Sequence, residues 1–171
     1  MEPQNEHGVL FREVQRFRQP VLWILFLFDL LVIIGVGWLI LPHEGVGSAA
    51  FVSYVVGAFL FAFGPPILLF ILRLVTEVRR DGIYYRFVPV HLSFHRITFE
   101  NLESYHARSY SPLREYGGWG IRWGFKRGWA YNVGGNQGVQ LELSDGKRIL
   151  FGSQRAEGFV KAIDEALGKT Q

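Results

Sequence analysis

The sequence contains no cysteine and a single methionine. Without cysteine the chain can form neither a disulfide framework nor a cysteine-ligated zinc site, although this absence does not fix the redox compartment. Charge is almost absent from two long segments: Val21–Leu41 contains only Asp29, and Gly45–Leu72 contains no charged residue. Apolar runs of this length indicate a membrane location, so we expect the rest of the chain to be organised around them.

Each run is long enough to cross a membrane as a helix. A helix rises about 1.5 Å per residue, so about 20 residues cover a hydrocarbon core of about 30 Å. The intervening Pro42-His43-Glu44 leaves room only for a tight turn. Residues 20–75 are therefore predicted to form a transmembrane helical hairpin, with a proline kink in the second helix at Gly64-Pro65-Pro66.

Basic residues flank these runs asymmetrically. Three arginines precede the first run, three follow the second, and the connecting turn contains neither Lys nor Arg. The positive-inside rule then predicts a multi-pass protein of the cell (plasma) membrane with both termini in the cytoplasm. The arginines are Arg12, Arg16, Arg18, Arg73, Arg79 and Arg80.

Residues 1–19 precede the first run. Val9–Gln19 mixes apolar residues with arginines. One interpretation is a short interfacial helix with its arginines at phosphate depth. We favour the other, a cytoplasmic extension of the first span whose basic residues only set the topology.

Asp29 lies inside the first run. A carboxylate at that depth costs several kcal/mol unless it is neutral, paired or hydrated. The second run offers no basic partner, although Ser53 or Tyr54 could donate a hydrogen bond. We favour a protonated or hydrogen-bonded acid in a helix interface over a functional acid in transport or proton coupling.

After the second run, short alternating segments predict β-strands. Asp81-Gly82 indicates a hairpin turn. A three-residue loop at Ser144–Gly146 would pair Leu141 with Ile149 and make the glycine a bulge residue. The chain then closes with an amphipathic helix over Arg155–Leu167.

Five short pieces of the second half of the chain carry a resemblance to known proteins: Tyr110–Pro112, Tyr116–Arg122, Ala130–Asn132, Gly138–Leu141 and Gly152–Arg155. Through these pieces and the two apolar runs, the chain resembles bacterial and archaeal membrane proteins with a cytoplasmic pleckstrin-homology-like (PH-like) domain. Six or seven antiparallel strands followed by one helix is the element order of that domain. The resemblance implies an α+β membrane protein in which residues 76–171 form a bent antiparallel sheet or barrel closed by the C-terminal α-helix. It implies no phosphoinositide site, because the first hairpin loop, Arg80-Asp81-Gly82, is short and contains an acid.

Tryptophan, glycine and basic residues concentrate between residues 117 and 138. From Arg73 to Arg127 there are ten Lys or Arg against five acids, a net charge of +5, whereas Gly128–Gln171 has five of each. Trp and Arg are enriched at interface hot spots, and basic residues with Trp suit an anionic membrane surface. The alternative is that the tryptophans fill the core and the arginines are solvated. The predicted interface or lipid-facing residues are Trp119, Arg122, Trp123, Lys126, Arg127 and Trp129.

No motif predicts a catalytic, cofactor or metal site. Gly134–Gly138 lacks a P-loop lysine and precedes a strand. His91, His95 and His106 have no acid or cysteine at ligand spacing, and no G-x-S-x-G motif is present. We therefore expect neither an enzyme nor a nucleic-acid-binding protein.

The favoured hypothesis for the function is an assembly or adaptor module, a scaffold that forms homo-oligomers in the lipid bilayer or binds another membrane protein. A second hypothesis is a sensor of anionic lipid headgroups at the inner leaflet. A third is a small transporter or channel that uses Asp29.

Overall fold

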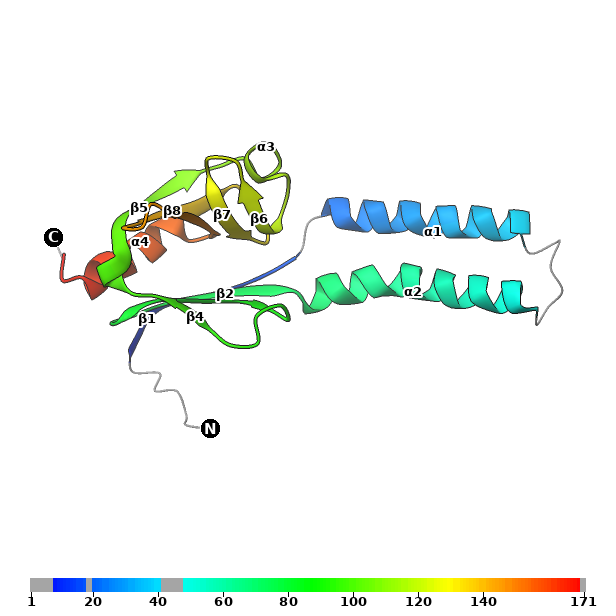
Figure 1. Ribbon diagram of the computed structural model, residues 1–171, viewed down its shortest axis with the longest axis horizontal. Helices are drawn as coiled ribbons and strands as arrows, with labels where there is room; N and C mark the ends of the chain where they lie inside the picture. The colour runs from blue at the N-terminus through cyan, green and yellow to red at the C-terminus, as the bar shows by residue number, and fades with distance from the viewer. Residues whose placement is uncertain (1–7, 18–19, 41–47, 170–171) are drawn as a thin grey trace. The chain divides into compact units, whose positions relative to one another are not determined.

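The computed structural model describes residues 8–17, 20–40 and 48–169 and divides the chain into two compact units. Residues 17–71 form a helical unit, and residues 1–16 together with 72–171 form a sheet unit. Figure 1 shows the strands of the sheet unit and the two long helices of the other. The sheet unit is therefore discontinuous in sequence, because the helical unit is inserted after its first strand.

The helical unit consists of α1 (Pro20–Ile40) and α2 (Ala49–Ile71). Among the described residues, α2 is the one helix long and apolar enough to span a membrane, while α1 contributes a shorter apolar stretch, Phe26–Leu39. The α-helix α2 continues through Pro65 and Pro66 instead of ending there.

A tyrosine joins these two helices. The Tyr54 hydroxyl of α2 donates a hydrogen bond to the Ile33 carbonyl of α1. A Cβ atom at Gly37 would lie 2.6 Å from the Tyr54 hydroxyl oxygen, so glycine is needed where this ring approaches α1.

The first sheet is antiparallel, in the order β1-β2-β3-β4. Phe11, Glu13 and Gln15 of β1 are buried, while the residues between them are exposed. The two-residue period of a strand thus directs one side of β1 into the interior. The strands are β1 (Val9–Arg16), β2 (Arg73–Arg79), β3 (Gly82–Val88) and β4 (His95–Ile97).

The second sheet has the order β5-β8-β9-β7-β6. Strands β7 and β9 are parallel, and the other neighbours are antiparallel. Its strands are β5 (Leu102–Ser109), β6 (Gly120–Gly124), β7 (Gly128–Asn132), β8 (Gln137–Leu143) and β9 (Arg148–Gly152). Three short helices complete the unit: the 3₁₀ helix η3 (Phe99–Asn101), α3 (Pro112–Tyr116) and α4 (Ala156–Ala166).

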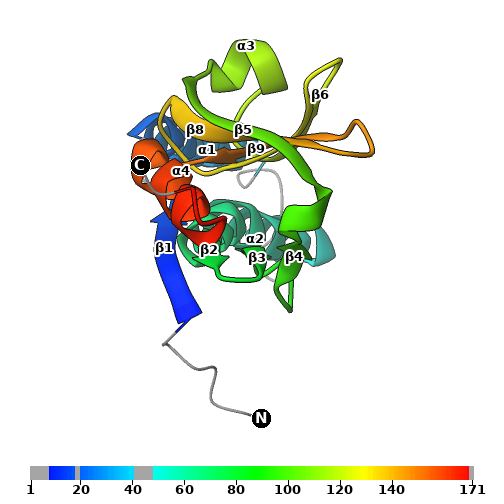
Figure 2. The same cartoon turned by 90° about the vertical axis from the view of Figure 1, so that its left-hand side faces the viewer.

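The core of the sheet unit lies between the two sheets and α4, which Figure 2 shows alongside both sheets. Phe159 and Ile163 of α4 are fully buried, and the Phe159 ring stacks on Phe11 of β1 at 5.1 Å between centroids. Burying each such side chain stabilises the unit by about 1.5–3 kcal/mol. This contact explains why a strand from before the helical unit belongs to the sheet unit.

Three local predictions are confirmed. Strands β8 and β9 pair Leu141 with Ile149, and Gly146 has a positive φ of 79° at the end of the loop. Strands β2 and β3 form the expected hairpin. The C-terminal helix α4 forms, and its stripe faces the core.

The predicted fold class, a two-helix transmembrane hairpin followed by a PH-like domain, is wrong. The sheet unit has nine strands in two sheets, among the described residues, and a parallel β7–β9 pair that a bent antiparallel sheet would lack. Strand β1, expected as an interfacial helix or an extension of a span, pairs with β2, for example Val14 with Val75. Only α2 meets the requirements of a span among the described residues.

Candidate functional site: an exposed aromatic hairpin

Strands β6 and β7 form an antiparallel hairpin at the edge of the second sheet. Trp123 pairs directly with Trp129, and Lys126 in the turn has a positive φ of 62°. A Cβ atom on Gly128 would lie 2.1 Å from the Arg148 carbonyl oxygen. Only glycine therefore allows the start of β7 to approach strand β9 so closely.

The inner face of the second sheet continues onto this hairpin. Trp129 pairs with Ile149, and Tyr131 pairs with Phe151, so the four side chains share one face. The exposed fraction rises along this face from 0% at Phe151 and 8% at Ile149 to 45% at Trp129 and 59% at Trp123. The described core covers only part of an apolar face that extends to the hairpin.

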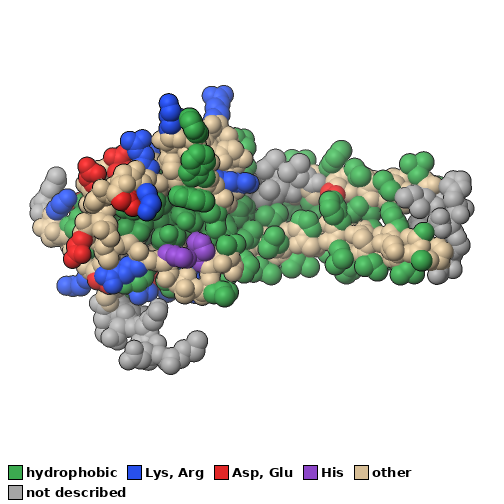
Figure 3. Space-filling view, viewed as in Figure 1, with side chains coloured by type: hydrophobic (Ala, Val, Ile, Leu, Met, Phe, Trp, Pro, Cys, Tyr) green, Lys and Arg blue, Asp and Glu red, His purple; other side chains and the backbone are tan. Residues whose placement is uncertain are grey.

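Phe125 in the turn extends this apolar area, and Lys126 lies next to it. Phe125 is 76% exposed, its ring meets the Trp123 ring edge-on, and Lys126 places its ammonium 5.8 Å from the Phe125 ring centroid. Trp123, Phe125, Lys126 and Trp129 are called the hairpin surface below. Figure 3 shows hydrophobic side chains between Lys and Arg side chains on one face of the sheet unit. Clustered exposed aromatic residues of this kind are typical of interaction sites.

The structure separates the other predicted residues from the hairpin surface. Arg122 is exposed but lies on the opposite face of β6, where it pairs with buried Ala130. Its Nε donates a hydrogen bond to the Trp119 carbonyl at 2.9 Å. The Trp119 ring is half-buried, and its Nε1 is buried without a hydrogen-bond partner among the described atoms. Three of the six predicted residues, Trp123, Lys126 and Trp129, therefore belong to the hairpin surface, whereas Trp119 and Arg122 do not.

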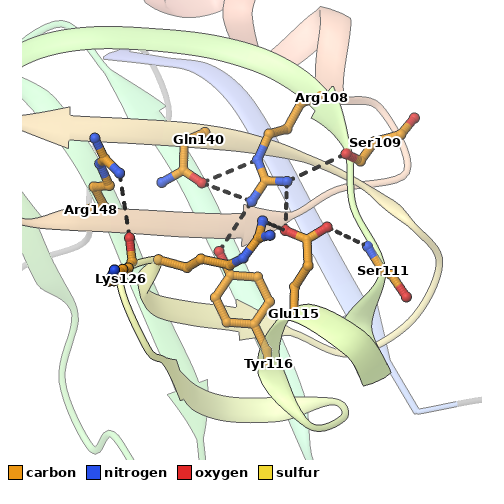
Figure 4. Close-up of polar contacts among 9 residues, drawn as sticks. Arg108, Ser109, Ser111, Glu115, Tyr116, Lys126, Gln140 and Arg148 are labelled. Carbon is orange, nitrogen blue, oxygen red and sulfur yellow. Dashed lines mark hydrogen bonds and ion pairs between the residues drawn. The ribbon is translucent and has the colours of Figure 1, made fainter.

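Arg127 is held by a polar network centred on Glu115, a residue of α3 (Figure 4). The same carboxylate pairs with Arg108 at 2.9 Å and accepts the Ser111 backbone N–H at 2.8 Å. Arg108 also donates to Gln140 of β8 at 3.1 and 3.2 Å. The network therefore fixes the end of the hairpin against α3 and the second sheet.

This network determines the charge state of Glu115. Burial acts to raise the pKa of Glu115, but the hydrogen bond from Ser111 and the Arg108 guanidinium lower it below its ordinary value. The carboxylate is consequently ionised at neutral pH and shares its single negative charge between Arg108 and Arg127. Lys126 is the cation among the four residues of the hairpin surface.

Sequence reasoning missed Glu115, Arg108 and Gln140. Arg108 and Glu115 are 7 residues apart in the sequence, and Arg108 and Gln140 are 32 residues apart. No fixed spacing indicates such a set, because the β5–β8 pairing brings it together. The predicted Gly- and Trp-rich segment was the available signal for the hairpin, but it did not indicate which side chains share a face.

Two of the three histidines considered as candidate metal ligands are neighbours. The rings of His91 and His95 lie 4.3 Å apart, and His91 Nδ1 accepts the Phe87 backbone N–H at 3.2 Å. Burial and then the neighbouring His95 lower the pKa of His91. His106 is exposed on β5, and the described residues contain no group of three or more candidate metal ligands.

Asp29 is half-buried in α1. The Tyr54 hydroxyl, one of the two groups that could donate a hydrogen bond to Asp29, donates to the Ile33 carbonyl instead. A role for Asp29 in transport or proton coupling stays a hypothesis.

The chain matches the family described as "Family of unknown function (DUF6141)" over residues 1–169, and it therefore belongs to this family. No curated protein and no solved structure gives a significant match.

Proposed function

We propose that the protein is a membrane-anchored assembly module that forms homo-oligomers through the hairpin surface. The observation that carries this proposal is the continuation of the inner sheet face onto exposed Trp129 and Trp123. Burying a tryptophan removes roughly 150–250 Å² of surface from water, so covering these half-exposed rings is worth on the order of 2–4 kcal/mol each. The proposal assigns no catalytic residue.

A second copy of the chain is the occupant that this surface suits. Two copies related by a two-fold axis would each present the same aromatic rings, as an isologous interface requires. Anchoring in one membrane raises the effective concentration of copies and reduces the orientational freedom lost on association. The single cation, Lys126, lies beside an aromatic ring and can remain at the rim of the interface.

The location is part of the proposal. We place α2 in the cell membrane and the sheet unit in the cytoplasm, in a multi-pass arrangement with both termini on that side. The pairing of β1 with β2 supports this, because it keeps the chain before α1 and the chain after α2 on one side. Arg16 and Arg73, which flank the helical unit in the sequence, agree with the positive-inside rule.

Light scattering of the full chain in detergent would test self-association. Trp123→Ala and Trp129→Ala should each weaken association by about 2 kcal/mol, or about thirtyfold, the size expected for an interface hot spot. Arg122→Ala is the matched control, because this neighbouring side chain lies on the opposite face of β6. A wild-type chain that is monomeric at every concentration would contradict the assembly hypothesis. If the tryptophan variants also lost affinity for anionic vesicles, anionic-lipid sensing would become the leading hypothesis.

A further inference from the structure

The outer face of the first sheet is rich in arginine. Residues that pair across antiparallel strands share a face, so the register gathers side chains from all four strands on the side turned away from the core. Six arginines lie on this face: Arg12, Arg16, Arg73, Arg79, Arg86 and Arg96.

Acids pair with the arginines at one end of this face. Glu77, whose side chain is 4% exposed, pairs with Arg79 at 2.6 Å and with Arg12 at 3.5 Å. Asp81 pairs with Arg96 at 3.2 Å. Each of the three arginines at this end therefore already has an acidic partner.

The other end has no such compensation. Arg16 and Arg73 are directly opposite each other on β1 and β2, and Arg86 on β3 is diagonal to Arg73, next to its partner Val88. Among the described residues, no acid forms an ion pair with any of the three arginines. Like charges placed directly opposite destabilise a sheet, so an anion bound between them would stabilise it.

A second observation points to a ligand at this end. The Nε groups of Arg73 and Arg86 are buried and have no hydrogen-bond partner among the described atoms. A buried donor left unpaired costs about 1–3 kcal/mol. The Arg86 guanidinium also lies over the Phe94 ring, 4.5 Å from its centroid, which holds the group while leaving its in-plane N–H groups able to donate.

We propose that Arg16, Arg73 and Arg86 form a binding site for the phosphate of an anionic lipid headgroup. Guanidinium groups donate two parallel hydrogen bonds to phosphate oxygens, and three of them can supply donors to the several acceptor oxygens of an anionic phosphodiester. The site lies on the first sheet and shares no residue with the hairpin surface.

The chain itself indicates a lipid as the source of the phosphate. Arg73 is two residues after Ile71, the last residue of α2, so at most about 7 Å of extended chain separates their Cα atoms. Arg16 is four residues before Pro20, where α1 begins. If α2 is in the membrane, these arginines are held near the headgroups of an anionic leaflet. The inference thus rests on the proposed membrane location and not on self-association.

The test uses the full chain in an uncharged detergent, with thermal unfolding as the readout. Soluble short-chain phosphatidylglycerol should raise the midpoint of the wild-type protein, whereas the matching phosphatidylcholine should not, because its headgroup has no net charge. Arg73→Gln and Arg86→Gln should each reduce the apparent affinity for phosphatidylglycerol by about tenfold or more. Arg96→Gln, at the end of the same face where the arginines pair with acids, is the control and should bind like the wild type.

Any of three results would overturn the proposal. The first is equal stabilisation by both lipids, and the second is unchanged phosphatidylglycerol affinity in Arg73→Gln and Arg86→Gln. The third is an equal effect of inorganic phosphate at the same concentration, which would identify a free-phosphate site. Arg73→Lys keeps the charge but loses the planar fork, so an intermediate affinity supports the site even if the glutamine variant folds poorly. Alkaline extraction of membranes tests the location of α2 separately. A protein that stays in the membrane but shows no lipid selectivity would reject only this inference.

Discussion

The Glu13 carboxylate of β1 accepts a hydrogen bond from the Ser153 hydroxyl at 2.5 Å, across 140 positions of the chain. It also accepts the Gln154 backbone N–H at 2.8 Å. Glu13 is 7% exposed, so these bonds lie in the interior of the sheet unit. They join the strand before the helical unit to the segment that leads into α4.

Removing this carboxylate should destabilise the sheet unit. Glu13→Ala leaves the buried Ser153 hydroxyl and the partly buried Gln154 N–H without their acceptor, and we expect a loss of about 2–4 kcal/mol in the free energy of unfolding. Glu103→Ala, at an exposed acid of β5, should change it by less than about 0.5 kcal/mol. Thermal unfolding of both variants would measure the difference, and equal midpoints would show that β1 is not held by these bonds.

Glycine is required at Gly135 for its backbone conformation alone, and at Gly128 for both its backbone conformation and a close contact. Both have positive φ, 78° and 74°, but a Cβ at Gly128 would meet the Arg148 carbonyl oxygen whereas one at Gly135 meets nothing within 4 Å. Gly135→Ala should cost about 1 kcal/mol from backbone conformation alone. Gly128→Ala should cost about 3 kcal/mol or more, because β7 must also move away from its neighbour. Similar unfolding midpoints for the two variants would contradict the close approach of β7.

The lowered pKa of Glu115 predicts a pH dependence. A carboxylate whose pKa is lower in the folded state contributes stability that is present above its ordinary pKa of 4.5 and is lost as the pH falls through the folded-state value. Glu115→Gln should remove that part of the pH dependence while lowering stability at neutral pH. Unfolding midpoints measured against pH for both proteins would show it, and parallel curves would contradict the ionised network.

The fold could be predicted only where local rules decide it. The register of Leu141 with Ile149 follows from the alternation of apolar and polar residues and from the loop length, and both depend only on residues close together in the sequence. The strand β1 could not be recognised, because Glu13 and Gln15 occupy inward positions where a strand pattern normally has apolar residues. Their hydrogen bonds to residues of the chain's other end make these positions tolerable.

The candidate site was predictable in composition but not in arrangement. The sequence indicated Trp123 and Trp129 as candidate interface or lipid-facing residues, yet it grouped them with Arg122, which strand alternation directs to the other face. Phe125 was missed because a single phenylalanine in a turn resembles a core residue until its exposure is known. Four of the six arginines on the first sheet were used only as topology signals, since their common face depends on the β1–β2 pairing.

Cysteine cross-linking in native membranes tests the proposed assembly most directly. The natural chain has no cysteine, so a single introduced thiol reports one position. Lys126→Cys lies on the hairpin surface, and Lys161→Cys on the exposed side of α4 is its matched control. A bifunctional thiol reagent should cross-link Lys126→Cys into a dimer that is lost when Trp129→Ala is added, and it should leave Lys161→Cys monomeric. Equal cross-linking at both positions, or a Lys126→Cys dimer that Trp129→Ala does not weaken, would contradict assembly through this surface.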